Sequence, residues 1–389
     1  MKVAGDWLTR PETQAVCRML TGAGHRALLV GGCVRNALLG FPVADVDVAT
    51  DARPETVSVL AEKAGLKAVP TGLAHGTVTV VAGHVAHEVT TFRRDVETFG
   101  RHATVRFSTD VAEDAARRDF TMNALYATPE GEVVDPLGGL PDLMSRRLRF
   151  VGDAAARIEE DYLRILRFFR FHAWYADPAG GIDAEGLAAC ATHVGGLAQL
   201  SRERVGAEMR KLLQAPDPAP AVAAMAQCGV LAQVLPGADA TALPVLVHLE
   251  AGRPPRWMRR LAVLGGTGLT EALRLSRDES RMVALIRDEI GSLRPPAELG
   301  YRHKVELAAD IVLARAALTG APAPDGWQAA VATGAAARFP LRAADLMPGL
   351  SGPALGARLA ELEARWIASG FRLSGPDLLG GGGGGFPSP

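Results

Sequence analysis

The chain has 389 residues, 48% of them hydrophobic, and its 42 Lys and Arg residues nearly balance 43 Asp and Glu residues. This length and composition suffice for two or more domains with large cores. A formal net charge of −1 excludes nucleic-acid binding through overall positive charge, although a local basic surface remains compatible with it.

The sequence also limits the compartment and the kinds of metal site. It contains no apolar stretch of about 20 residues, so we expect no membrane-spanning helix. Asp6 interrupts the N-terminal segment where a secretory signal would continue its apolar core. The cysteines Cys17, Cys33, Cys190 and Cys228 are widely spaced, which argues against a zinc site and a disulfide framework. We therefore expect reduced thiols in a cytoplasmic protein.

Strand and helix patterns alternate over residues 1–150. Short β-branched runs predict strands and the segments between them predict helices, which indicates an α+β head with a small mixed β-sheet. The predicted strands are Ala27–Val30, Val46–Ala49, Gly76–Val81, Val85–Thr91 and Val133–Asp135, and the clearest helices are Val34–Leu39 and Pro54–Ala64.

Asp45 and Asp47 are separated by one residue at the start of the second predicted strand. Alternate residues of a strand point to the same face, so the two carboxylates should project together while Val46 and Val48 pack behind them. Paired carboxylates repel each other unless a divalent cation lies between them. The alternative is a solvated strand end, and the segment before the aspartates argues against it.

Gly31 and Gly32 follow the first predicted strand and lead into the helix that carries Arg35. Glycine lets the backbone approach a bulky anion, and the N–H groups at the start of a helix favour phosphate. A hard metal ion beside a phosphate cradle is what phosphoryl or nucleotidyl transfer needs. The diglycine and the aspartates together predict such a site.

Two more motifs precede residue 150. Residues 117–125 read Arg-Arg-Asp-Phe-Thr-Met-Asn-Ala-Leu, which places Arg118 at an element boundary near a core. A guanidinium group suits triphosphate oxygens because its planar fork can donate two hydrogen bonds. Residues 134–143 contain Asp-Pro-Leu-Gly-Gly and predict a turn in which Asp135 braces the neighbouring backbone.

The segment Glu160–Phe171 predicts a helix with one apolar face. Residues three apart are near neighbours on a helix, so Asp161 should lie beside Arg164. One interpretation is an ordinary salt bridge. The other is base recognition, in which the carboxylate accepts from the exocyclic amine of C or A and the arginine donates to the adjacent ring nitrogen. Such a pair would reject U and G, which leave buried polar groups unpaired.

Strand patterns nearly vanish after residue 150, and Ala-, Leu- and Arg-rich helical segments dominate. We predict a catalytic head over residues 1–150, a helical neck over 151–214 and a helical body and tail over 215–379. Residues 380–389 are almost all Gly, Pro and Ser and should be disordered.

The predicted body contains a local excess of basic residues. Arg256, Arg259 and Arg260 lie around Trp257, which suits phosphate contact with a stacking aromatic ring. The alternative is that these arginines are spread over solvated helix faces, because the chain is rich in arginine and poor in lysine. The sequence leaves both interpretations open.

The motifs, taken in order, resemble those of class II tRNA nucleotidyltransferases of the polymerase β-type superfamily. These are the bacterial and eukaryotic CCA-adding enzymes, and poly(A) polymerases of the bacterial type share the motifs. The resemblance covers about residues 25–213, a little over half of the chain. The matching segments are Gly-Gly-x-Val-Arg-Asn, Asp-x-Asp, Arg-Arg-Asp-Phe-Thr-x-Asn, Asp-Pro-x-Gly-Gly, Glu-Asp-x-x-Arg-x-x-Arg and Leu200-Ser201-Arg202-Glu203-Arg204.

The resemblance implies a role for each matching position. Asp45 and Asp47 would be the catalytic residues that hold Mg²⁺, with Glu88 as a candidate supporting carboxylate. Asp161 and Arg164 would read the base in the neck. The other nucleotide-binding positions would be Gly32, Arg35, Arg118, Arg167 and Arg170.

The resemblance also implies substrates and partners. CTP and ATP would be added to tRNA without a template, with the group Arg256, Trp257, Arg259 and Arg260 as candidate tRNA contacts. No membrane and no obligate protein partner are implied. Because adjacent His-Asp is absent from the sequence, we expect no second, phosphohydrolase site.

Three alternatives remain at this point. A poly(A) polymerase or an enzyme that adds the terminal A alone would share these motifs. In the family a flexible loop between motifs assists the switch from C to A addition, and the segment Thr91–Thr109 provides a loop of adequate length. A catalytically silent RNA-binding protein is disfavoured because both metal carboxylates are present.

Overall fold

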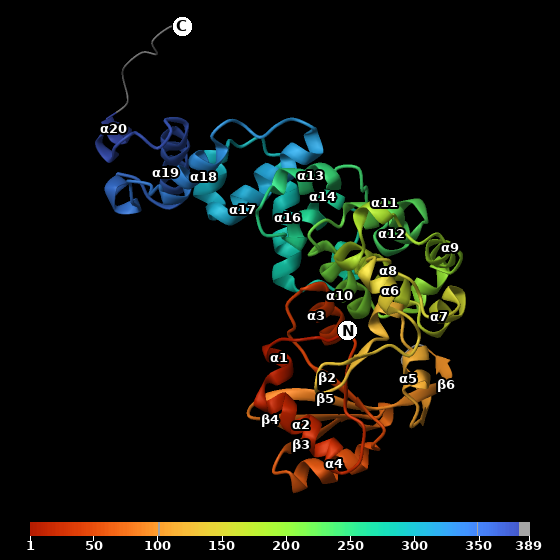
Figure 1. Cartoon of the computed structure of the whole chain (residues 1–389). Coiled ribbons are helices and arrows are strands. Elements are labelled where there is room, and N and C mark those ends of the chain that lie inside the picture. The colour runs from red at the N-terminus through yellow and green to blue at the C-terminus, as the bar shows by residue number, and fades with distance from the viewer. Residues whose placement is uncertain (100–101, 348, 381–389) are drawn as a thin grey trace. The chain divides into compact units, whose positions relative to one another are not determined.

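The computed structural model describes residues 1–99, 102–347 and 349–380 (Figure 1). The chain divides into two compact units. The first unit comprises residues 1–238 and 266–274, so the predicted head and neck belong to one unit. The second unit comprises the remaining residues from 239 onward. The Gly- and Pro-rich tail that we expect to be disordered lies, apart from Gly380, outside the described residues.

A seven-stranded mixed sheet forms the centre of the first unit, in the order β3-β4-β5-β2-β1-β8-β9. Neighbouring strands are antiparallel except β2 and β5, which are parallel. The predicted α+β class is therefore confirmed. The strands are β1 (Leu28–Val30), β2 (Asp47–Thr50), β3 (Lys67–Gly72), β4 (Thr77–Ala82), β5 (Val85–Thr91), β8 (Tyr126–Ala127) and β9 (Val133–Val134).

The segment Thr91–Thr109, which we expected to be a loop, is mostly a β-hairpin. Strands β6 (Arg93–Phe99) and β7 (His102–Phe107) pair antiparallel in a separate two-stranded sheet. Valine, threonine and phenylalanine recur in both strands, and these residues favour extended backbone. Residues 100 and 101, between the strands, lie outside the described residues.

The helices of the head start where local chemistry favours a start. Both α2 and α4 have proline at the first position and an acidic residue in the first turn, where the helix dipole stabilises negative charge. The helices of this region are α1 (Asp6–Thr9), α2 (Pro11–Thr21), α3 (Gly32–Leu39), α4 (Pro54–Lys63), α5 (Val111–Ala116) and α6 (Leu140–Met144), with short 3₁₀ turns at η1 (Leu73–His75) and η2 (Thr121–Asn123).

The rest of the first unit is helical. A cluster of aromatic rings joins it to the head: Phe120 lies 4.9 Å from Phe150 and 5.1 Å from Phe171 between ring centroids, and Phe150 stacks on Phe168. The elements are α7 (Ala154–Glu160), α8 (Leu163–Tyr175), η3 (Pro178–Gly180), α9 (Ala184–Thr192), η4 (Val194–Gln199), α10 (Arg202–Leu213), α11 (Ala219–Gln227), α12 (Val230–Val234) and α15 (Leu269–Ala272).

The described residues of the second unit form helices and turns, as the sequence predicts. An aromatic and aliphatic cluster around Leu362 and Trp366 forms the core of its C-terminal part. The elements are α13 (Leu243–Glu250), α14 (Trp257–Leu264), α16 (Arg277–Ile290), α17 (Pro296–Thr319), α18 (Trp327–Ala336), η5 (Ala343–Leu346), α19 (Gly352–Ala368) and α20 (Gly375–Gly380). Across the described part of the chain, we find no helix with the length and apolar character that crossing a bilayer requires.

Candidate functional site

The predicted carboxylates lie at the start of a central strand. Asp47 is the first residue of β2, and the exposed Asp45 precedes it by two residues. Val46 and Val48 are buried, so the two aspartates do alternate with core residues. The parallel strand β5 places Glu88 directly opposite Asp47. Because residues in register share a face of the sheet, Glu88 lies beside the aspartates.

The environment of Asp47 fits a hard cation. Burial raises the pKa of Asp47 to about 6, and Glu88 and Asp45 raise it as well, whereas Arg118 lowers it. This acidic group therefore carries negative charge that the protein does not fully compensate, and carboxylate oxygens are the ligands that Mg²⁺ prefers.

Among the described residues, no three His, Cys, Asp or Glu side chains are spaced to hold a metal ion together. A divalent cation bound by Asp45 and Asp47 would take its other ligands from a bound phosphate or from water, as Mg²⁺ commonly does.

The diglycine forms the turn between β1 and α3. Gly31 has a φ of 70°, a left-handed conformation that side chains other than glycine rarely adopt. A Cβ atom at Gly31 would lie 3.3 Å from Nη1 of Arg118. The helix α3 starts at Gly32, and its first turn contains no acidic side chain. This start of α3, with a guanidinium group above it, has the features of a phosphate cradle.

Arg118 is held in place by two residues that sequence reasoning missed. Its Nε donates to the hydroxyl of Tyr126 at 3.1 Å, and its Nη2 donates to Asp114 at 3.0 Å. The Tyr126 hydroxyl in turn donates to Asp114 at 2.7 Å. The sequence signal was an aspartate four residues before Arg118, a spacing that brings side chains together in a helical turn.

Arg35 was predicted to meet phosphate, but its contacts are with the protein. Its side chain donates to Asn123, to Asn36 and to the hydroxyl of Tyr175, and its guanidinium group stacks over the Tyr175 ring at 4.0 Å. The residue is buried. In this structure Arg35 ties α3 to α8, and a contact with phosphate would require these bonds to rearrange.

The predicted nucleotide residues Arg167 and Arg170 are also paired within the protein. Arg167 donates to Asp119, and Arg170 donates to Glu208 of α10. Burial alone would raise the pKa of Asp119, but Arg167 and Asn123 lower it to about 2. The motif at residues 117–125 is therefore bonded to the neck helix α8.

Asp161 and Arg164 do not lie on one continuous helix, which corrects our expectation. The backbone of Asp161 is extended, so the residue separates α7 from α8. Its carboxylate accepts from Arg204 and from the backbone N–H of Leu163. Arg164 instead donates to Glu160 at 2.6 Å. The plain salt bridge between Asp161 and Arg164 is thus not the arrangement that forms.

Arg164 and its neighbour Arg157 bind the end of α5. Arg164 donates to the carbonyl of Arg117 at 3.2 Å, and Arg157 donates to that of Ala116 at 3.0 Å. Glu160 pairs with both arginines. These bonds link the candidate base-reading residues to the segment that leads into Arg118.

The turn at Asp135 is as predicted, because its carboxylate accepts from the N–H groups of Gly139 and Leu140, at 2.9 Å each.

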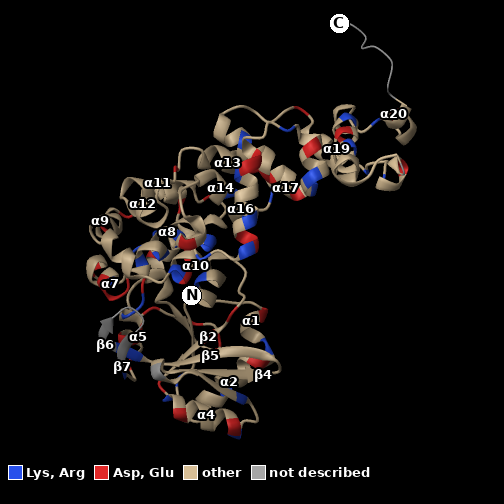
Figure 2. Cartoon of the chain, turned by 180° about the vertical axis from the view of Figure 1, so that it is seen from behind, with Lys and Arg blue, Asp and Glu red and all other residues tan. Residues whose placement is uncertain are grey.

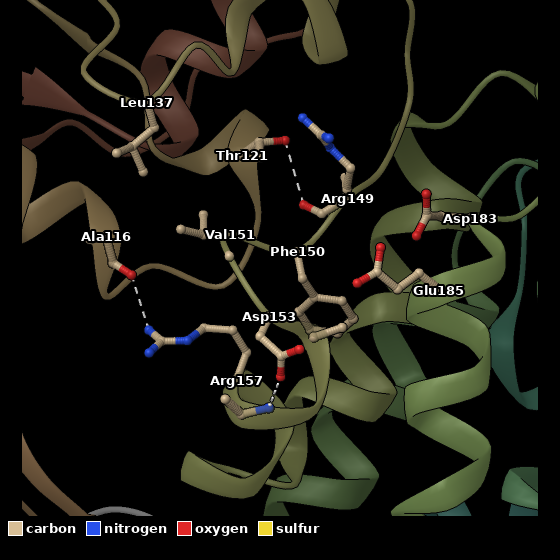
Figure 3. A pocket seen from close by; sticks show the side chains of 13 residues that line it. Ala116, Thr121, Leu137, Arg149, Phe150, Val151, Asp153, Arg157, Asp183 and Glu185 are labelled. Atoms are coloured by element: carbon tan, nitrogen blue, oxygen red, sulfur yellow. Dashed lines mark hydrogen bonds between the residues drawn. The ribbon is translucent and has the colours of Figure 1, made fainter.

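A cavity in the first unit lies apart from the candidate metal ligands. It has a volume of about 590 Å³ and lies beside Thr121, Phe150 and Arg157 (Figure 3). Most of its polar groups already have protein partners: Arg157 donates to Ala116, and Asp153 accepts from the N–H of Ala156. Neither Asp45 nor Asp47 lines this cavity, so it is not the candidate metal site.

Arg259 and Arg260, two of the predicted tRNA contacts, are buried. Their side chains are 2% exposed and bind Glu250 of α13, and Arg259 also binds Asp310 of α17. They are buried because α14, which carries both arginines, packs against α16 and α17. A sequence signal was available, because Asp310 is a lone acid within an apolar run.

The other two predicted tRNA contacts, Arg256 and Trp257, differ from Arg259 and Arg260 in their exposure. Arg256 and Trp257 are partly exposed, and Arg256 pairs with Glu306 at 2.7 Å and with Asp310 at 2.8 Å. Figure 2 shows basic and acidic residues interleaved along α16 and α17. The local excess of basic residues in the sequence therefore does not form a continuous basic stripe on these helices.

Comparisons with known proteins agree with this geometry. Residues 27–149 match the family described as the poly A polymerase head domain. Residues 181–241 match the family described as the probable RNA and SrmB-binding site of polymerase A.

Individual relatives cover most of the chain. The mitochondrial CCA tRNA nucleotidyltransferase 1 of Mus musculus is 32% identical over 94% of this chain and 88% of its own length. The CCA-adding enzyme of Geobacillus stearothermophilus is 35% identical over 81% of this chain and 80% of its own length.

Solved structures show the same fold. The Bacillus stearothermophilus CCA-adding enzyme in complex with CTP superposes with a TM-score of 0.69 at 29% identity and covers 92% of both chains. The Thermotoga maritima CCA-adding enzyme complexed with tRNA_CCA superposes with a TM-score of 0.70 at 17% identity, covering 98% of this chain and 97% of its own.

Proposed function

The chain belongs to the CCA tRNA nucleotidyltransferase family, and we propose that it adds C, C and A to the 3′ ends of tRNA from CTP and ATP. The observation that carries this proposal is the register that sets Glu88 of β5 opposite Asp47 at the start of β2, with Asp45 two residues before Asp47. Mg²⁺ at the aspartates would activate the tRNA 3′-hydroxyl and stabilise the departing pyrophosphate.

The phosphates of the nucleotide would lie over the diglycine. The N–H groups at the start of α3 face this place, and Nη1 of Arg118 lies beside Gly31. Asp114 and Tyr126 hold the other two nitrogens of Arg118, so the guanidinium group is oriented before the nucleotide arrives. This orientation supports in-line attack on the α-phosphorus, because positioning is the main contribution of the protein to phosphoryl transfer.

Asp161 and Arg164 would select the base. Each oxygen of the Asp161 carboxylate accepts one hydrogen bond from the protein, and each has a second lone pair that can accept from an exocyclic amine. Arg164 is fixed by Glu160 and by the carbonyls of Arg157 and Arg117. A base-reading pair held this rigidly can select C and A without a template strand.

The remaining assignments belong to the same proposal. Residues 1–150 would form the catalytic head, 151–214 the base-reading neck and 215–379 the tRNA-binding body and tail. The buried thiols Cys17, Cys33 and Cys190 suit a reducing compartment such as the cytoplasm.

Incorporation assays test the activity. The purified protein is incubated with Mg²⁺, each nucleoside triphosphate and either tRNA that lacks CCA or tRNA that ends in CC. Three added residues followed by a stop support CCA addition. An untemplated run of A would identify a poly(A) polymerase instead, and extension of the CC-ending tRNA alone would identify an A-adding enzyme.

A further inference from the structure

The β-hairpin brings two arginines directly opposite each other. Arg94 of β6 and Arg106 of β7 are register partners in the antiparallel pair. Directly opposite residues share one face of a sheet, and like charges placed this way destabilise the pairing. Arg94 has one loose ion pair, 3.7 Å from Glu113. Among the described side chains, Arg106 forms no ion pair.

The same two arginines line a polar cavity of about 340 Å³, together with Arg53 at the start of α4. Ser108 and Thr109 contribute hydroxyl groups to its wall. Three arginines from separate elements therefore line one hollow that is open to solvent. Guanidinium forks and hydroxyl groups are the donors that bind phosphate oxygens in proteins.

The wall holds two acidic residues against three arginines, so the arginines are in excess. Asp51 accepts from the N–H of Arg26 at 2.8 Å and lies 3.2 Å from His25, so one of its carboxylate oxygens already has partners outside the wall. Glu113 is partly exposed and contacts Arg94 at a distance where an exposed ion pair contributes little.

We infer that this cavity binds a phosphate group, and that its occupant is a backbone phosphate of the RNA substrate. Its distance from the reaction separates it from the nucleotide site. Asp47 begins β2 and Asp51 directly follows its end, four residues later, which places this wall of the cavity roughly 13 Å from the metal carboxylates. The identification of RNA rests on the proposed function, whereas phosphate binding rests on the arginines alone.

Binding here would also connect separate elements. A phosphate that contacts Arg53, Arg94 and Arg106 joins the hairpin to α4 and removes the repulsion between β6 and β7. The binding energy therefore includes relief of the cross-strand repulsion, so that an anion should stabilise the folded protein without any turnover.

Thermal unfolding with sodium phosphate, compared with sodium chloride at equal ionic strength, tests the site. The variants are Arg106→Gln and Arg106→Lys, and the matched control is Arg18→Gln, which removes an exposed arginine from α2. We expect phosphate to raise the melting temperature of the wild type and of Arg18→Gln. Arg106→Gln should lose most of this shift, and Arg106→Lys, which keeps the charge without the fork, should retain part of it.

Measuring tRNA affinity against salt concentration identifies the source of the phosphate. Loss of one phosphate contact should make the log–log slope shallower by about 0.7–0.9 in Arg106→Gln. A lost thermal shift with an unchanged slope would assign the site to free phosphate. Equal thermal shifts in all four proteins together with equal slopes would overturn the proposal. Neither measurement uses turnover, so a failure of CCA addition in the incorporation assay is a separate result.

Discussion

The two units of this chain use buried charge in opposite ways. In the second unit, Arg259 donates from all three guanidinium nitrogens, to Glu250 and to Asp310. Each of these nitrogens therefore has a carboxylate partner inside the protein. An arginine paired in this way supports the fold, and its three nitrogens are already engaged.

The candidate site in the first unit is less balanced. Asp47 and Glu88 lie opposite each other near Asp45, and burial together with these neighbours raises the pKa of Asp47 to about 6. Arg118 has protein partners on Nε and Nη2, while its Nη1 faces Gly31. Charge that the protein leaves uncompensated, rather than the number of charged residues, distinguishes a binding site from a structural cluster here.

The strongest test of this contrast is Asp47→Asn. If the carboxylate holds a divalent cation, loss of several kcal/mol of transition-state stabilisation should reduce CCA addition by about 10³-fold or more. We expect tRNA binding and the melting temperature to change little, because the variant removes uncompensated negative charge. The measurement is extension of tRNA that lacks CCA, with Glu55→Gln, an exposed carboxylate on α4, as the control. Near-normal turnover in Asp47→Asn would show that this cluster is structural.

The opposite outcome is expected for Arg259→Met in the second unit. Removing this side chain leaves Glu250 and Asp310 buried with one partner fewer, which should cost about 3–5 kcal/mol of unfolding free energy. Urea denaturation measures the loss, and Arg281→Met, on the exposed face of α16, is the control. Because Arg259 is buried, the salt dependence of tRNA binding should be unchanged. A shallower salt slope with unaltered stability would instead restore a phosphate-binding role.

This contrast also explains what sequence could predict. Asp45, Asp47 and the diglycine were found because their chemistry lies within one short segment, where strand and helix periodicity fixes the geometry. The burial of Arg259 could not be found that way, because its partners are 9 and 51 residues distant. The same limit hid Tyr126 and the break at Asp161, both of which depend on packing between elements.

Arg118→Gln tests whether Nη1 of that arginine, which faces Gly31, serves the nucleotide. Charge-assisted hydrogen bonds contribute about 1.5–3 kcal/mol, so the KM for CTP and for ATP should rise roughly 10- to 100-fold. Arg147→Gln, which removes an arginine whose side chain is 58% exposed in the same unit, provides the control. The variant also leaves Asp114 with one partner fewer, so the melting temperature must be measured alongside. A fall in stability with unchanged KM would place Arg118 with the structural arginines.

Asp161→Ala should produce the smallest effect, because it alters discrimination more than overall binding. Loss of the acceptor should reduce the preference for CTP over UTP by about tenfold, since the exocyclic amine of C then has no partner. Competition between CTP and UTP during extension of tRNA measures this ratio, with Glu159→Ala, an exposed acid on α7, as the control. The pairing with Arg204 supplies a second comparison. Arg204→Ala removes the partner and keeps the acceptor. The contrary result would be that Arg204→Ala abolishes discrimination while Asp161→Ala preserves it. That result would make Arg204 of α10 the selective residue and Asp161 its structural partner.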